Sequence, residues 1–178
     1  VHIGHLAIAN YLVEMTGLDE IWFIVSPHNP LKPESELINE KYRFDMVRLA
    51  IGNYGKFKVS DIEFSLPKPS YTIDTLKYIS KKHPHYHFSL IIGGDSLEKF
   101  DQWKSYQDIL SDYSVIVYPR PGYQPDLNAY PMVKYITEAP LLGISATFIR
   151  QCVQQDIDIR FYLTEKVYTY IIENKLFR

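Results

Sequence analysis

The chain alternates between short apolar runs and longer stretches in which apolar residues recur at helical spacing. The run from Ile21 to Val25 (IWFIV) is apolar and rich in β-branched residues, which predicts a strand buried on both faces. Similar runs predict further strands at 57–62, 88–92, 114–118 and 133–137. Helical spacing predicts helices at 6–15, 41–51, 73–82 and 161–173, and another helix that begins at Ser145. Thr72 is the predicted N-cap of the helix at 73–82.

This alternation of strands and helices is typical of an α/β fold, a doubly wound parallel sheet with helices on both faces. Three proline-rich loops interrupt it, at 26–33, 65–70 and 118–125. Because such folds bind ligands at the carboxyl ends of their strands, these loops are candidate site loops. The length of 178 residues suits a single domain spanning 1–178.

Composition narrows the class of protein. Apolar residues make up 46% and charged residues 22%, which is ordinary for a globular protein and excludes a disordered chain. The net charge of −2 argues against a nucleic acid partner. No run approaches the ~18 apolar residues of a membrane helix, and no signal peptide is visible, so we expect no membrane partner and a cytoplasmic location. Cys152 is the only cysteine, which excludes an internal disulfide and a cysteine-based zinc site.

The first candidate motif is His2-Ile3-Gly4-His5, placed directly before a predicted helix. The free N–H groups at a helix N-terminus favour an anion, and two imidazoles there would donate hydrogen bonds to phosphate oxygens. Gly4 would let a ligand or a neighbouring backbone approach closely. Two ordinary loop histidines are the alternative interpretation.

The second candidate motif is GISATFIR, residues 143–150. Ser145 is a predicted N-cap, Thr147 lies in the first turn, and Arg150 lies further along the same helix. Hydroxyls, backbone N–H groups and a planar guanidinium would together hold phosphate oxygens. A plain capped helix is the alternative, but a second helix N-terminus equipped for polyphosphate favours a shared role for the two motifs.

These motifs resemble the signatures of the nucleotidylyltransferase superfamily. Four further blocks are similar to bacterial nicotinate-nucleotide adenylyltransferases: PSYTIDTL (69–76), IIGGDSLEKFDQW (91–103), RPGY (120–123) and VYTYIIENKLFR (167–178). The resemblance spans essentially the whole chain in the same order. It implies a Rossmann-like fold and an enzyme that transfers AMP from ATP to nicotinate mononucleotide, giving deamido-NAD and pyrophosphate.

The resemblance also assigns residues to ATP. His2 and His5 would bind the triphosphate, with His5 stabilising the transition state at the α-phosphorus. Ser145, Thr147 and Arg150 would hold the β- and γ-phosphates. In the loop after the first predicted strand, Leu31 stands where the family often has histidine, so a phosphate contact from this loop would rest on Lys32.

Other residues are implied to bind nicotinate mononucleotide. Asp95 would bind a ribose, and Trp103 would stack on the pyridine ring. The backbone at Tyr71 and Thr72 would receive the pyridine carboxylate. An N-cap role for Asp95 and an ordinary packing role for Trp103 are the alternatives, and Arg120 is interpreted as a solvated loop charge.

The family places a strand and a Gly-x-Phe-x-Pro loop before its HxGH motif. This sequence begins inside that motif, so we expect that the strand and loop are missing from the N-terminus.

We expect no dedicated metal site, with Mg²⁺ arriving bound to ATP. His83, His85 and His87 alternate as three zinc ligands on a strand would, but Pro84 interrupts them, and we expect a solvated loop. A related nucleotidylyltransferase, such as pantetheine-phosphate adenylyltransferase or a cytidylyltransferase, and an inert nucleotide-binding module remain alternatives. The sequence leaves a monomer or a homo-oligomer open.

Overall fold

A computed structural model of the protein describes residues 1–28 and 38–178. The chain divides into two compact units. Unit 1 comprises Val1–Ser65 and Gly143–Arg178, and unit 2 comprises Leu66–Leu142. Across the described ranges, no helix has the length and apolar character needed to cross a membrane.

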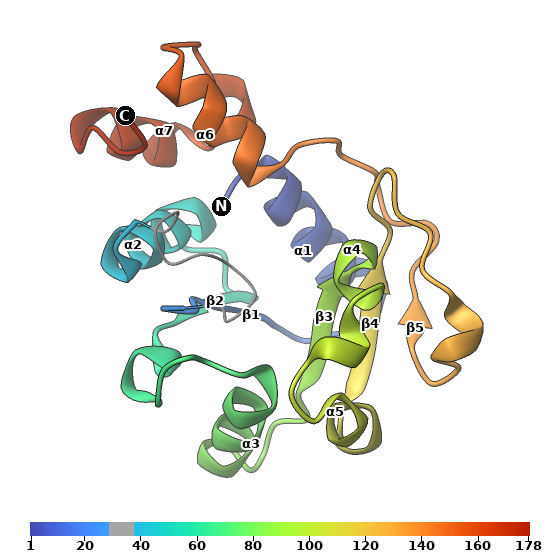
Figure 1. The fold of residues 1–178 in the computed structure, drawn as a ribbon. Helices are drawn as coiled ribbons and strands as arrows, with labels where there is room; N and C mark the ends of the chain where they lie inside the picture. Colours follow the sequence, from blue (N-terminus) through green and yellow to red (C-terminus); the bar gives the residue numbers. More distant parts are fainter. Residues whose placement is uncertain (29–37) are drawn as a thin grey trace. The chain divides into compact units, whose positions relative to one another are not determined.

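Unit 1 contains a pair of parallel strands and four α-helices (Figure 1). The strands β1 (Ile21–Ile24) and β2 (Phe57–Ser60) pair in register from Ile21 with Phe57 to Ile24 with Ser60. The helices are α1 (Ile3–Met15), α2 (Glu40–Ile51), α6 (Ala146–Gln154) and α7 (Glu165–Glu173). Single 3₁₀ turns occupy Ile62–Ser65 and Arg160–Tyr162.

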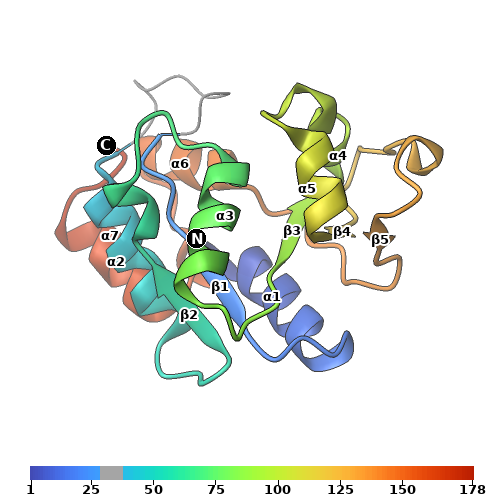
Figure 2. The ribbon, with the colours of Figure 1, turned by 90° about the horizontal axis from the view of Figure 1, so that it is seen from below.

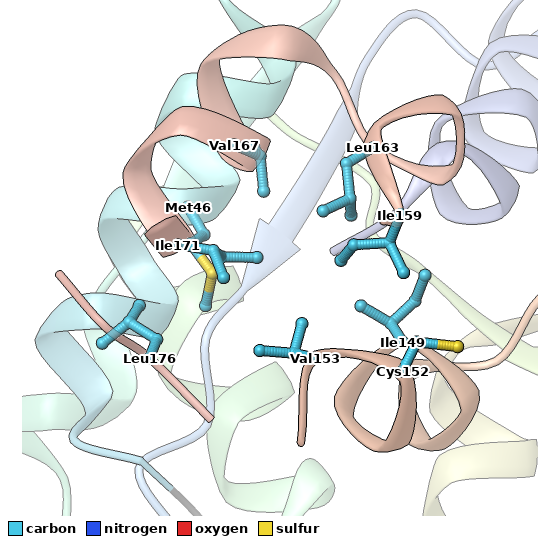
Figure 3. Close-up of a cluster of buried hydrophobic side chains, with 9 residues drawn as sticks. All are labelled: Met46, Ile149, Cys152, Val153, Ile159, Leu163, Val167, Ile171 and Leu176. Atoms are coloured by element: carbon cyan, nitrogen blue, oxygen red, sulfur yellow. The ribbon is translucent and has the colours of Figure 1, made fainter. Parts of the chain in front are cut away.

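A hydrophobic cluster joins the late helices of unit 1 to α2 (Figure 3). Its buried members are Met46, Ile149, Cys152, Val153, Ile159, Leu163, Val167, Ile171 and Leu176. At the edge of this contact, the hydroxyl of Tyr170 on α7 donates to Asp45 Oδ2 on α2 at 3.1 Å. Burial of apolar surface is the main stabilising force here, so the position of α6 follows from this cluster.

Unit 2 contains a three-stranded parallel sheet in the order β3-β4-β5 (Figure 2). The strands are β3 (Ser89–Gly93), β4 (Ser114–Tyr118) and β5 (Lys134–Tyr135). The helices are α3 (Thr72–Lys82), α4 (Gly94–Leu97) and α5 (Tyr106–Asp112), with 3₁₀ turns at Phe100–Gln102 and Leu127–Ala129. Val115, Ile116 and Val117 of the central strand β4 are buried, as its continuous apolar run predicts.

Each strand pair in the described ranges is parallel, and the predicted α/β class is confirmed. The predicted strand at 114–118 agrees with β4, but the one at 133–137 is reduced to the two residues of β5. The predicted strand at 57–62 ends at Ser60, where the chain turns into a 3₁₀ helix. Thr72 is the first helical residue of α3 rather than its N-cap, because Tyr71 keeps the extended conformation.

Two neighbouring isoleucines of α7 test the role of the cluster. Ile171 is 2% exposed and Ile172 is 40% exposed, so only the first contributes a buried side chain. We expect Ile171→Ala to lower the free energy of unfolding by about 2–5 kcal/mol. The matched control Ile172→Ala should stay within about 1 kcal/mol of the parent. Urea unfolding followed by circular dichroism measures both, and equal losses would contradict this description of the core.

Candidate functional site

The helix α1 begins at the His2-Ile3-Gly4-His5 motif in unit 1. His2 is the N-cap, and its carbonyl accepts from the backbone N–H groups of His5 at 3.0 Å and Leu6 at 3.4 Å. Its side chain makes no capping hydrogen bond, so the first N–H groups of the helix are left without an intrahelical partner. The His2 ring is buried and the His5 side chain is exposed, with ring centroids 3.9 Å apart. His5 is therefore the imidazole that solvent and a ligand can reach.

Gly4 allows two close approaches at this point. A Cβ atom on Gly4 would lie 3.0 Å from Cε1 and Nδ1 of His2 and 3.8 Å from Cβ of Ile144. The first distance is tighter than ordinary van der Waals contact, so glycine lets the His2 ring lie over the first turn of α1. The second distance places the start of the GISATFIR motif directly beside the same turn.

The helix α6 begins as the sequence predicts. Ser145 is its N-cap, and Ser145 Oγ accepts from the backbone N–H of Phe148 at 3.1 Å. Arg150 Nη2 donates to Thr147 Oγ1 at 3.1 Å, which fixes a half-buried guanidinium over the first turn. Ser145 Oγ accepts the capping bond and keeps its own O–H to donate, so this O–H, the first N–H groups of α6 and the other donors of Arg150 are available to an anion.

The N-termini of α1 and α6 lie next to each other in unit 1 (Figure 1). Val1 and Ile144 both pack against the hydrophobic cluster, which includes Ile149 of α6. Two positive helix ends and a guanidinium converge on one place, which suits a polyanion.

Lys32 lies outside the described residues. No pattern in the sequence singles out Arg43 of α2, whose guanidinium hydrogen-bonds to backbone carbonyls at residues 26, 27 and 38. Its guanidinium donates to the carbonyls of Pro27 at 2.8 Å and Ile38 at 3.1 Å, and also to that of Ser26. In the sequence, Arg43 looks like any charged residue of an amphipathic helix, and no local signal marks it.

In unit 2, the helix α3 begins in the PSYT block. The carbonyl of its N-cap Tyr71 accepts from the N–H groups of Asp74 at 3.0 Å and Thr75 at 3.1 Å. The N–H groups of the first turn, at Thr72 and the residue after it, have no intrahelical partner. Just before the helix, Ser70 is 8% exposed, and its buried hydroxyl has no hydrogen-bond partner within the described part of the chain. Unused donors therefore gather at this helix end.

The residue after Trp103 contacts the same helix end. The ring of Trp103 lies beside the fully buried Phe100, with centroids 5.2 Å apart, and Trp103 itself is half-buried. The next residue, Lys104, places Nζ 2.8 Å from Asp74 Oδ2 and 4.6 Å from the centroid of the Tyr71 ring. These contacts bring the segment of Trp103 to the first turn of α3, as a shared ligand site would require.

Asp95 lies in the first turn of the short helix α4, after the sheet strand β3. Gly93 is the N-cap of α4, so the alternative capping role of Asp95 is not seen. Asp95 Oδ1 instead lies 3.4 Å from Arg120 Nε, with both side chains about one-third exposed or less. Arg120, interpreted as a solvated loop charge rather than a ligand contact, lies in a loop and is partly exposed, and it also forms an ion pair with Asp95.

The histidine run ends α3 and leads toward β3. His83 is the C-cap of α3, and the segment of His83, His85 and His87 is a loop, as predicted, with β3 beginning only at Ser89. Within residues 1–28 and 38–178, no group of three or more His, Cys, Asp or Glu side chains is arranged to hold a metal ion.

The chain is similar to one protein family and to several named relatives. Residues 1–152 match the cytidylyltransferase-like family. A relative from Cytophaga hutchinsonii is 50% identical over 178 residues, covering 99% of this chain and 92% of the relative. A relative from Bacteroides fragilis is 46% identical over 173 residues, covering 97% of this chain and 86% of the relative. Both are named probable nicotinate-nucleotide adenylyltransferases.

The chain belongs to the nicotinate-nucleotide adenylyltransferases of the cytidylyltransferase-like family. The resemblance predicted from the sequence motifs is thereby confirmed. The HxGH motif (2–5) and the GISATFIR motif (143–150) both lie inside residues 1–152, which match the family.

Solved structures support the Rossmann-like fold of this adenylyltransferase. The nicotinic acid mononucleotide adenylyltransferase of Plasmodium falciparum, complexed with NaAD, has a TM-score of 0.81 at 21% identity and covers 99% of this chain and 91% of its own. A putative nicotinate-nucleotide adenylyltransferase from Vibrio parahaemolyticus has a TM-score of 0.71 at 18% identity, covering 99% and 88%. At these identities, the likeness shows the fold alone.

The glycine pair before Asp95 provides a matched test of the site geometry. A Cβ on Gly93 would lie 2.4 Å from Asp95 Oδ1 and 2.9 Å from Arg120 Cγ, whereas one on Gly94 meets its nearest atom at 3.5 Å. We expect Gly93→Ala to lower the free energy of unfolding of this adenylyltransferase by about 1–3 kcal/mol, because the ion pair must move. Gly94→Ala should leave stability unchanged or raise it by up to about 1 kcal/mol. Denaturant unfolding of both variants measures this, and equal effects would contradict the crowding at Gly93.

Proposed function

We propose that this protein transfers the adenylyl group of ATP to nicotinate mononucleotide, giving deamido-NAD and pyrophosphate in NAD biosynthesis. A phosphate oxygen of the mononucleotide forms a bond to the α-phosphorus, and the bond from the α-phosphorus to the pyrophosphate oxygen breaks. One observation carries the proposal: the N-termini of α1 and α6 meet where a Cβ on Gly4 would lie 3.8 Å from Ile144 Cβ. Its support in the family is the 50% identity to a relative named for this activity. The proposal includes a cytoplasmic location.

The reaction needs positioning and charge stabilisation rather than a nucleophilic side chain. Orientation of two bound reactants is worth ~7–11 kcal/mol of the barrier. Each preorganised donor to the developing charge adds roughly 2.7–4 kcal/mol. The exposed imidazole of His5 is the donor we assign to the α-phosphoryl group, with His2 behind it in ring contact. Ser145, Thr147 and Arg150 form the turn that we assign to the β- and γ-phosphates.

We assign the nicotinate mononucleotide to residues of unit 2. The unused N–H groups at Thr72 and the next residue of α3 would receive the pyridine carboxylate, with Tyr71 as the N-cap of that helix. Trp103 would stack on the pyridine ring, since Phe100 supports one side of it and the rest is accessible. Asp95 would accept from a ribose hydroxyl, with its carboxylate oriented by Arg120.

A divalent cation accompanies ATP in nucleotidyltransferases of this kind, and we propose that the ion is Mg²⁺. Mg²⁺ keeps several waters and is held largely by substrate phosphates in enzymes of nucleotides. That binding mode fits a chain whose described residues offer no cluster of three or more metal-ligating side chains. The ion would shield the charge of the triphosphate.

A substrate panel tests the proposed function directly. Pyrophosphate release is measured with ATP and, in turn, nicotinate mononucleotide, nicotinamide mononucleotide and 4′-phosphopantetheine. We expect nicotinate mononucleotide to give the highest kcat/KM. Turnover of 4′-phosphopantetheine instead would support the alternative that the protein is a pantetheine-phosphate adenylyltransferase. ATP binding without turnover of any acceptor would show a nucleotide-binding module.

His5 provides the sharpest test among the ATP-binding residues. We expect His5→Ala to lower kcat by about 100-fold or more, because a donor to the α-phosphoryl transition state is lost. Asn10→Ala is the matched control, since Asn10 is exposed on the same helix, and it should leave kcat unchanged. Steady-state pyrophosphate release measures both. A loss of kcat below about threefold for His5→Ala would contradict its role.

Trp103 tests the mononucleotide site separately. Removing a stacking surface weakens binding of the pyridine ring but leaves the triphosphate contacts in unit 1 intact. We expect Trp103→Ala to raise KM for nicotinate mononucleotide by about 10-fold and KM for ATP by less than about twofold. The two KM values come from varying each substrate at saturation of the other. Equal increases would mean that Trp103 does not stack on the pyridine.

A further inference from the structure

Asp74 places a carboxylate at the helix end where the proposed function requires another carboxylate to bind. It is an exposed residue in the first turn of α3, one turn from the N-cap Tyr71. A negative charge there stabilises the helix, because it interacts with the positive end of the helix dipole. The same negative charge repels an incoming carboxylate. It also cancels part of the positive potential of the helix end, which would otherwise attract that carboxylate.

Lys104 faces this carboxylate. Its Nζ lies 2.8 Å from Asp74 Oδ2 and 4.6 Å from the centroid of the Tyr71 ring, so one ammonium contacts both residues of the helix start. Lys104 also directly follows Trp103, the residue assigned to the pyridine ring. Its charge is thus held at the edge of the proposed acid site by contacts that do not involve a ligand.

A second ion pair joins α3 to α5, the helix that follows the turn of Lys104, without touching this site. Lys77 of α3 lies 3.4 Å from Asp108 of α5, and its side chains are 55% and 52% exposed, against 47% and 49% for Lys104 and Asp74. Both pairs are surface pairs, whose net contribution to stability is small. The pair of Lys77 therefore serves as an internal control for any effect of Lys104 on fold stability.

The unused polar groups at the start of α3 point to a ligand at this helix end. Ser70 is 8% exposed, and the structure gives its buried hydroxyl no partner among the described residues. The N–H groups of the first turn are also without intrahelical partners. A charged carboxylate accepts stronger hydrogen bonds from such donors than a neutral amide oxygen does.

We propose that Lys104 determines the preference for an acid over an amide at the pyridine site by neutralising Asp74. This inference rests on the proposed function. With Lys104 present, the helix end keeps its positive field, and an acid binds without repulsion. Without Lys104, the carboxylate of Asp74 is unpaired and repels the acid, while a carboxamide carries no charge to be repelled. Lys104 therefore acts indirectly: it neutralises the charge of Asp74 and does not itself bind the substrate.

The test compares five proteins: the parent, Lys104→Met, Asp74→Asn, the double variant with both changes, and the control Lys77→Met. KM for nicotinate mononucleotide is measured at saturating ATP, at low and high salt. We expect Lys104→Met to raise this KM about fivefold at low salt and less at high salt, because salt screens exposed charges. The KM of nicotinamide mononucleotide as a substrate, or its inhibition constant as a competitive inhibitor, should change by less than about twofold.

The double variant decides between neutralisation and simple support of Trp103. If Lys104 acts by cancelling Asp74, removal of both charges returns KM for the acid to within about twofold of the parent value. A KM for the double variant that stays as high as that of Lys104→Met would overturn the inference. A KM for Lys77→Met that rises as much as that for Lys104→Met would also overturn it. Asp74→Asn alone should leave KM for the acid equal or lower, and a raised KM would contradict repulsion by Asp74.

Failure of the proposed function gives a different result. In that case the parent protein itself releases no pyrophosphate from ATP and nicotinate mononucleotide, whatever stands at position 104. Turnover by the parent with no change in KM on removal of Lys104 would retain the function and reject the inference.

Discussion

The structure depends on the hydrophobic contact that holds α6 against the beginning of α1. Val1 and Ile144 pack on the cluster that contains Ile149 and Val153 of α6, and Gly4 leaves room for Ile144 at the first turn of α1. Two segments from distant parts of the sequence are thereby fixed with their helix N-termini side by side. Apolar burial supplies the energy, and the electrostatic character of the site is its consequence. A helix end moved by one ångström would separate the donors that one polyphosphate must contact.

The same physical solution recurs in each compact unit of the chain. In each proposed binding site, the donors at a helix N-terminus are backbone N–H groups, which only a substitution by proline removes. Side chains then adjust the local charge around these helix ends. Arg150 adds positive charge beside α6, whereas Lys104 balances the acid Asp74 on α3. A site built in this way needs no nucleophile, which agrees with a direct transfer between two phosphate-bearing substrates.

Much of this organisation can be predicted from the sequence, because the features concerned are local. Ser145 is a good N-cap by residue type, and the structure shows its capping bond to Phe148. The apolar run at 114–118 predicts a buried strand, since a strand covered on both faces has no polar alternation. The candidate residues themselves came from motifs, and their roles toward substrates stay predictions.

Other features could not be predicted, because they depend on which distant segments come together. The ion pair of Lys104 with Asp74, and that of Arg120 with Asp95, join residues whose sequence neighbours give no sign of a partner. Arg43 looks like a solvated helix charge until its three backbone acceptors are seen. Tyr71 replaces Thr72 as an N-cap for a similar reason, because hydroxyl chemistry favours threonine but backbone conformation decides the helix start.

The most direct measurement is a crystal structure of this protein with a nonhydrolysable ATP analogue. Our account predicts that one triphosphate has oxygens within about 3 Å of the His5 imidazole and also of donors at the start of α6, either its first N–H groups or Arg150. A triphosphate that contacts only one of the two helix N-termini, or neither, would contradict the account.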